Sequence, residues 1–375
     1  MVYYACKSFH KEQNVMVFKV FQQSNTRKAF QFSAVIFLAA TCAETVSAHV
    51  KWFVEYDVTK PPLPIGEVLN GMFIEMFLVS VVGVYLFFLA DRYIYEGGYL
   101  AEFDKKLKLF DNLANSIMRI AAGVFFLSLF IWYLVYGTTF YLTPELKTTA
   151  VYVPWLHLIL ALSVLLRRTT PIAGIGVFFL FIAATFDYGI FHLLDYMIFL
   201  GIGYYLLVAN SDKKGLIKSG FVVLFACIGL TLIWGAAEKF AYPYWTNPLF
   251  EKNPQMLMGM SAERFMRVSG FVEFFITFIL LGAVSVIGRL IALGFMSIFV
   301  LAIIQFGIVD AIGHLMIVAI LFVLIVRGPT SARDMLVLPD KSLFTEAYFM
   351  TGLYFLAFVM IFILYYGIHH LTYGV

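Results

Sequence analysis

The sequence is poor in charge and in cysteine. Only 13% of its 375 residues are Asp, Glu, Lys or Arg, where a soluble domain carries ~25%. A chain of this length with so little charge cannot cover a water-facing surface, which excludes a soluble enzyme. The three cysteines, Cys6, Cys42 and Cys227, form no CxxC motif, so a thiol–disulfide relay within the chain is not expected.

Motifs for attaching cofactors are missing as well. The chain has no CxxCH sequence for covalent haem and no GxGxxG loop of a dinucleotide-binding unit. The formal charge is only +3, and the basic residues lie between apolar runs instead of in one patch, so no nucleic-acid partner is expected. Any electron transfer therefore requires a partner protein or a bound cofactor.

Apolar residues, in contrast, are abundant. They make up 62% of the chain and form runs long enough to cross a bilayer as helices, which takes roughly 17–25 residues. No run alternates strictly between apolar and polar residues, as an outer-membrane strand does. We therefore predict an all-α polytopic membrane protein, surrounded by the lipid bilayer, with about ten transmembrane helices. The predicted spans are residues 68–90, 113–136, 151–166, 171–187, 192–209, 216–236, 265–286, 290–308, 311–326 and 346–367.

The first 48 residues resemble a secretory signal. Three basic residues, Lys19, Arg27 and Lys28, precede a short apolar stretch at 32–40. The small residues at 46–48 suit signal peptidase, so cleavage is predicted after Ala48, which makes His49 the first residue of the mature chain. The alternative is an uncleaved anchor with the same orientation.

The distribution of basic residues predicts the orientation. Of the 26 Lys and Arg residues, five precede position 49, and fourteen of the remaining 21 lie in segments on the same side of the predicted spans. Basic residues are retained on the cytoplasmic side. We therefore predict a multi-pass protein of the bacterial inner membrane whose mature N- and C-termini lie on the periplasmic, or outer, side. The five tryptophans are then expected at the outer interface, most of them in a belt at headgroup depth, and His369 and His370 in a solvated tail.

Two similar segments indicate an internal repeat. The sequence GIFHLLDY at 189–196 and the sequence GIVDAIGH at 307–314 each begin a predicted span. An even number of spans per unit predicts two parallel four-helix repeats with one extra helix at each end. The predicted divisions are a signal peptide (1–48), an outer segment (49–67), the first span and inner loop (68–112), the repeats (113–209 and 216–326), and an inner loop, last span and outer tail (327–375).

The second repeat resembles the DoxX family of four-helix membrane proteins. The resemblance lies in the segment WGAAEKFAYP at 234–243, in Gly270-Phe271-Val272-Glu273 with Gly282, and in Gly288-Arg289, and it is clearest over 216–326. It implies association with a membrane redox system, and hence a membrane or periplasmic redox partner protein and a quinone as cofactor. If the chain is an enzyme, the resemblance implies an oxidoreductase subunit linked to quinone.

Histidines and buried acids gather in the outer half of the predicted topology. His192 and Asp195 lie at i, i+3, whereas Asp310 and His314 lie at i, i+4, so each pair can share one helix face. Imidazole and carboxylate ligands suit a transition metal such as copper, and His49 would add an amine and a further imidazole. The alternative is that these residues bind loop backbone at headgroup level.

Glu273 is the most distinctive single residue, because it lies inside a predicted span with no charge beside it. We predict that Glu273 and Glu238 are catalytic, with Glu273 as a proton acceptor or a hydrogen-bond partner for a quinone headgroup, and that Trp234 and Lys239 bind the cofactor. The alternative for Glu273 is an ion pair with Lys239 or Arg267.

Three functions agree with these observations. The first is a DoxX-like subunit of a membrane redox system, with an outward-facing His/Asp/Glu cavity for quinol, a metal ion or protons. The second is a non-enzymatic transporter or binding protein that takes a metal ion or small solute from the outer side. The third is an assembly subunit whose polar groups only satisfy one another.

Overall fold

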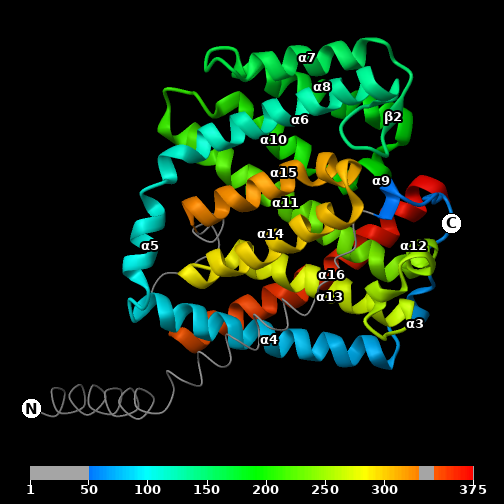
Figure 1. Cartoon of the computed structure of the whole chain (residues 1–375). Coiled ribbons are helices and arrows are strands. Elements are labelled where there is room, and N and C mark those ends of the chain that lie inside the picture. Colours follow the sequence, from blue (N-terminus) through cyan, green and yellow to red (C-terminus); the bar gives the residue numbers. More distant parts are fainter. Residues whose placement is uncertain (1–49, 329–341, 375) are drawn as a thin grey trace, which may run out of the picture. The chain divides into compact units, whose positions relative to one another are not determined.

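The computed structural model describes residues 50–328 and 342–374 (Figure 1). The predicted signal peptide and His49 lie outside these ranges. Within them, the chain is an all-α polytopic membrane protein, as the sequence predicts. Eight of its helices are long and apolar enough to cross a membrane.

The helices follow the predicted apolar runs closely. The longer ones are α4 (Gly71–Glu96), α6 (Ala114–Tyr136), α7 (Tyr152–Ser163), α8 (Thr170–Tyr188), α10 (Ile198–Val208), α11 (Lys214–Ala241), α13 (Ala262–Gly282), α14 (Val286–Phe306), α15 (Ile308–Arg327) and α16 (Leu343–Tyr373). The shorter elements are η1 (Val50–Trp52), α3 (Ile65–Val68), α5 (Ala101–Lys108), η2 (Asp111–Leu113), β1 (Thr139–Phe140), β2 (Lys147–Thr148), α9 (Ile190–Leu193), η3 (Leu194–Tyr196), η4 (Pro243–Thr246), α12 (Asn247–Lys252) and η5 (Pro254–Leu257).

Two of the ten predicted spans differ from straight transmembrane helices. α9 with η3 meets α10 at an angle of 62°, so the fifth predicted span is bent, and the described chain has up to nine spans if this pair counts as one. α7 has 12 residues, about 18 Å at 1.5 Å per residue, which is shorter than a hydrocarbon core of ~30 Å. Just after the C-terminal end of α7, Arg119 donates hydrogen bonds to the carbonyl oxygens of Val164 and Leu165.

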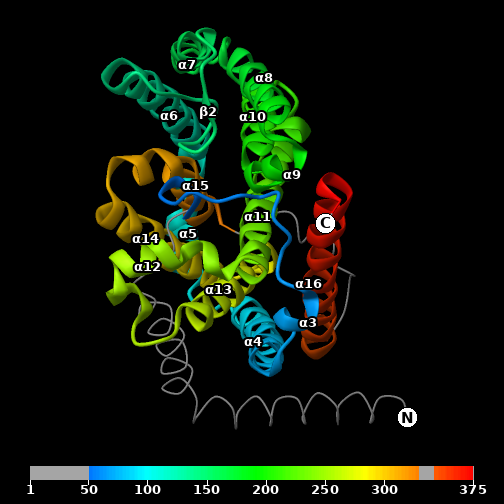
Figure 2. The ribbon, with the colours of Figure 1, turned by 90° about the vertical axis from the view of Figure 1, so that its right-hand side faces the viewer.

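Eight of the described helices pack in a closed order. α6, α7, α8, α10, α11, α13, α14 and α15 each pack on the next, and α15 returns to α6. The last helix of each predicted repeat thus contacts the first helix of the other. α4 and α16 form an outer pair against α13 and α11, and Figure 2 shows α4 below α13 and α16 beside α11.

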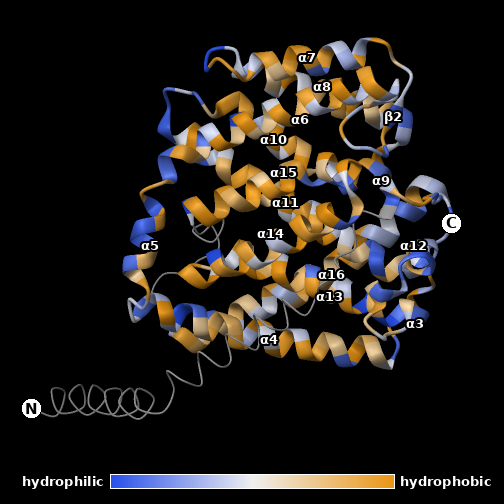
Figure 3. Cartoon of the chain, viewed as in Figure 1, coloured by the Kyte–Doolittle hydropathy of each residue, from blue (hydrophilic) through white to orange (hydrophobic). Residues whose placement is uncertain are grey.

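Polar residues collect at the two ends of the helices (Figure 3). One end carries α5, and the other, here called the α12 end, carries α9, α12 and the end of α16 (Figure 1). The α12 end also holds the β1–β2 hairpin, an antiparallel pair. Across it runs the N-terminal strap, defined here as residues 50–64.

Candidate functional site

The second half of the N-terminal strap is tied to α11 and α16 by hydrogen bonds. The bonds are Leu63 N to Ala241 O (2.9 Å), Tyr242 Oη to Lys60 O (2.8 Å), Tyr366 Oη to Leu63 O (2.8 Å) and His369 Nε2 to Val58 O (2.9 Å). The prediction of a solvated tail is therefore wrong for His369, which is buried because α16 continues to Tyr373 and packs under the strap.

The first half of the strap inserts Lys51 among acidic and aromatic side chains. Its Nζ lies 2.7 Å from Asp195 Oδ2 on η3 and forms a second ion pair with Glu238 on α11. The Lys51 and Asp195 side chains are 3% and 2% exposed, and that of Glu238 is 17% exposed. The ammonium also lies 5.3 Å from the ring centre of Tyr56 and 5.8 Å from that of Trp245. Burial by itself lowers the pKa of Lys51, but the neighbouring carboxylates outweigh it and raise the pKa above its usual value.

A second group of polar side chains adjoins the first. Tyr56 Oη donates to Glu145 Oε1 over 3.0 Å and lies 2.9 Å from His192 Nε2, and Glu145 and His192 contact each other directly. Glu145 comes from the β1–β2 hairpin, which Tyr188 fixes by donating to Lys147 O over 2.7 Å. Burial raises the pKa of Glu145, but the hydrogen bond to His192 and the charge of Lys51 lower it below its usual value.

Glu273 forms an ion pair, as the alternative interpretation expected. Its Oε2 lies 2.5 Å from Lys239 Nζ, and the two side chains are 15% and 13% exposed. Glu273 lies about three helical turns inside α13. Arg267 is not its partner, because that guanidinium binds Glu263 and the carbonyl oxygens of residues 67 and 68.

Gly235 joins the Lys51 group to the Lys239 pair. A Cβ atom built on Gly235 would lie 3.9 Å from Asp195 Oδ1 and 4.0 Å from both Glu273 Oε1 and Lys239 Nζ. The absence of a side chain therefore leaves room for a group of methyl or water size between the two ion pairs.

Together these residues form what we call the buried network. It contains four carboxylates, two ammonium groups, one imidazole and one phenol. Even with a protonated imidazole, the carboxylates outnumber the cations. Because carboxylates that share a buried site repel one another when ionised, such a network favours binding a proton at one of them. Its members are Lys51, Tyr56, Glu145, His192, Asp195, Glu238, Lys239 and Glu273.

Asp310 and His314 form a separate pair. His314 Nδ1 lies 2.8 Å from Asp310 Oδ2, and both side chains are fully buried. Trp52 of the strap covers the imidazole, with ring centres 4.7 Å apart. Gly313 provides the space, since a Cβ there would lie 2.0 Å from the indole.

The predicted metal ligands Asp195, His192, Asp310 and His314 therefore do not converge on one point, and each contacts another side chain. Asp195 binds Lys51, His192 contacts Glu145, and Asp310 binds His314. Within 50–328 and 342–374, no group of three or more His, Cys, Asp or Glu residues is arranged to hold a metal ion.

Trp234, predicted to contact a cofactor, packs in an aromatic core. Its ring centre lies 4.7 Å from that of Tyr365 and 5.5 Å from that of Phe191. Trp245 is also buried and stacks on Tyr242 at 4.0 Å. The interfacial belt is therefore wrong for both tryptophans, whereas Trp155 is exposed as a belt residue would be.

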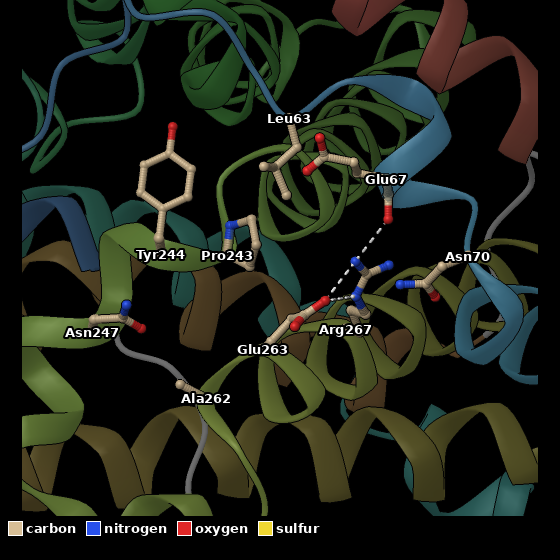
Figure 4. A pocket seen from close by; sticks show the side chains of 9 residues that line it. All are labelled: Leu63, Glu67, Asn70, Pro243, Tyr244, Asn247, Ala262, Glu263 and Arg267. Carbon is tan, nitrogen blue, oxygen red and sulfur yellow. Dashed lines mark hydrogen bonds and ion pairs between the residues drawn. The ribbon is translucent and has the colours of Figure 1, made fainter.

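A cavity of about 670 Å³ opens beside the strap at the α12 end (Figure 4). Arg267 is central to its wall, with bonds of 2.8 Å to Glu263 and 3.1 Å to Glu67 O (Figure 4). The lining residues are Leu63, Glu67, Asn70, Pro243, Tyr244, Asn247, Ala262, Glu263 and Arg267.

Lys51, Tyr56 and Glu145 are the network residues that the sequence interpretation missed. Lys51 lies in the short helix η1, and Tyr56 and Glu145 lie in loops. Polar residues are common outside the long helices and carry little signal there. A weak indication was present for Glu145, which stands in an otherwise uncharged segment between β1 and β2.

Comparison of the chain with models of protein families, with curated proteins and with solved structures finds no match.

Proposed function

We propose that this protein is a DoxX-like subunit of a membrane redox system and that its buried network takes up and releases protons on the outer side. In this proposal the chain lies in the bacterial inner membrane with its α12 end facing the periplasm. The resemblance over 216–326 supports the redox association. The gathering of four largely buried carboxylates in the buried network supports proton binding, and this single observation carries the proposal.

Two charged groups of the buried network keep their charge at neutral pH. Lys51, with its raised pKa, remains an ammonium at neutral pH, and Glu145, with its lowered pKa, remains a carboxylate. Lys51 therefore supplies one positive charge between the two carboxylates of Asp195 and Glu238. A proton added to this trio relieves the repulsion between its two carboxylates. Glu273 lies close by, since a Cβ on Gly235 would be 3.9 Å from Asp195 Oδ1 and 4.0 Å from Glu273 Oε1.

The cofactors implied by the sequence fit less well. The described residues bring no three metal ligands together. The space left by Gly235 fits a Cβ atom, with Asp195, Glu273 and Lys239 at 3.9–4.0 Å from it, and a quinone ring is much larger than that. We therefore assign the buried network to protons and place quinol and electron transfer on the redox partner.

Infrared pH titration of the purified protein tests proton binding. We expect a carbonyl band from a protonated, buried carboxylic acid, and we expect Glu238→Gln to remove or shift it. Glu251→Gln is the matched control, because Glu251 is exposed on α12. An unchanged spectrum in the folded Glu238→Gln protein contradicts a protonated trio.

Purification in mild detergent tests the redox association. We expect a haem- or flavin-containing protein, visible in the absorption spectrum, to copurify with the chain. If the preparation contains no redox protein and no quinone, and Glu273→Gln behaves as wild type in the native membrane, the redox proposal is wrong.

A further inference from the structure

The Lys51 ammonium lies in a cage of defined chemistry. The acidic walls are Asp195 Oδ2 at 2.7 Å and Glu238, and the aromatic walls are the rings of Tyr56 and Trp245 at 5.3 and 5.8 Å. We propose that this cage is a binding site for an external primary alkylammonium, and that Lys51 is a tethered occupant which such a ligand displaces.

The walls select for an ammonium group. Carboxylates form strong charge-assisted hydrogen bonds with N–H donors, and aromatic faces attract cations. An anion would meet two carboxylates and is excluded. The buried four-carbon stem of Lys51, whose side chain is 3% exposed, sets the ligand class, which is a linear alkylammonium of about four carbons.

The attachment of the strap indicates which part moves. The hydrogen bonds that tie its backbone to α11 and α16 lie at Val58, Lys60 and Leu63. Before Val58, the strap contacts the helices through three side chains: Lys51 lies in the cage, Trp52 packs over His314, and Tyr56 is hydrogen-bonded to Glu145. The segment 50–57 can therefore leave the cage while the rest of the strap stays in place.

A tethered occupant weakens binding of an external one. A group on a short flexible link has an effective concentration in the millimolar range or above. Removing the Lys51 side chain should therefore tighten alkylammonium binding at least about tenfold. The inference does not depend on a redox partner or on proton exchange, so it can fail while the proposed function stands.

The experiment uses the full-length protein in detergent and n-butylammonium chloride as the probe. Calorimetry gives the affinity of the wild type, Lys51→Ala and Lys60→Ala. Lys60 is the matched control, because its side chain is exposed on the same strap. We expect Lys51→Ala to bind at least about tenfold more tightly than the other two proteins, and tetramethylammonium, which has no N–H donor, to bind none of them.

Hydrogen exchange of segment 51–57 in the wild type tests displacement directly and does not require the variant to fold. We expect n-butylammonium to increase exchange there, and sodium chloride at equal ionic strength to leave it unchanged. Binding to Lys51→Ala with no change of exchange in the wild type would overturn the proposal, because Lys51 would then be a permanent structural ion pair. Absence of binding to folded Lys51→Ala would overturn it as well.

Discussion

The ion pair of Lys239 and Glu273 offers a quantitative test of the buried network. Lys239→Met leaves the Glu273 carboxylate three turns inside α13 without the ammonium that lies 2.5 Å away. Removing one partner of a buried pair costs ~3–5 kcal/mol, because the other charge stays desolvated. The side chains are 13% and 15% exposed, so we expect the lower end, about 3 kcal/mol, for Lys239→Met and for Glu273→Gln.

The double variant separates charge compensation from side-chain packing. Lys239→Met with Glu273→Gln removes both charges, so no uncompensated group remains, and we expect a loss of about 1 kcal/mol or less. The two single losses then exceed the double loss by about 5 kcal/mol, which is the interaction energy of the pair.

Unfolding free energies in mixed detergent micelles, followed by circular dichroism, provide the measurement. The control cycle uses Arg92 and Glu96, an i, i+4 pair whose side chains are 26% and 49% exposed. Such a pair should show an interaction energy of about 0.5 kcal/mol or less. If the effects of Lys239→Met and Glu273→Gln are additive, the two charges do not share a desolvated site, and our reasoning about the buried network is refuted.

Two further predictions concern the packing of the N-terminal strap and the β1–β2 hairpin beside it. Gly313→Ala places a Cβ where the Trp52 indole lies, so we expect the free energy of unfolding to fall by about 1–3 kcal/mol and hydrogen exchange at 51–57 to become faster. Gly294→Ala is the control, because Gly294 has open space around it. Equal exchange in both proteins would contradict the packing of Trp52 on Gly313. Glu145 has a lowered pKa when folded, so its contribution to stability is present above its ordinary pKa of 4.5 and is lost as the pH falls through the lower folded value. As the pH is lowered through that range, we expect the thermal midpoint of the wild type to decrease more steeply than that of Glu145→Gln. If the two midpoints decrease in parallel, Glu145 is not responsible for the loss of stability.

The membrane architecture was predictable from the sequence, because a long run of apolar residues by itself indicates a helix surrounded by lipid or by other apolar helices. Each run of bilayer length predicts a helix wherever its neighbours lie, and the observed helices α4, α11 and α16 begin within a few residues of the predicted spans or extend beyond them. The bend at α9–α10 was not predictable from hydropathy, because a run of the same composition can be straight or bent.

The site was predictable only in part. The sequence indicated Glu273, Glu238, His192 and Asp195, since ionisable residues within apolar runs stand out. It did not indicate Lys51, Tyr56 or Glu145, because polar residues outside the predicted spans are common and their sequence positions say nothing of their contacts.

The sequence by itself therefore determined the class of protein, the approximate positions of its spans and the acidic character of its α12 end. The tertiary structure alone decided which charges meet. Lys51 reaches Asp195, 144 positions away along the chain, because the strap folds back across the α12 end. Ion pairs depend on distances of a few ångströms between distant segments, and no local pattern of residues encodes them.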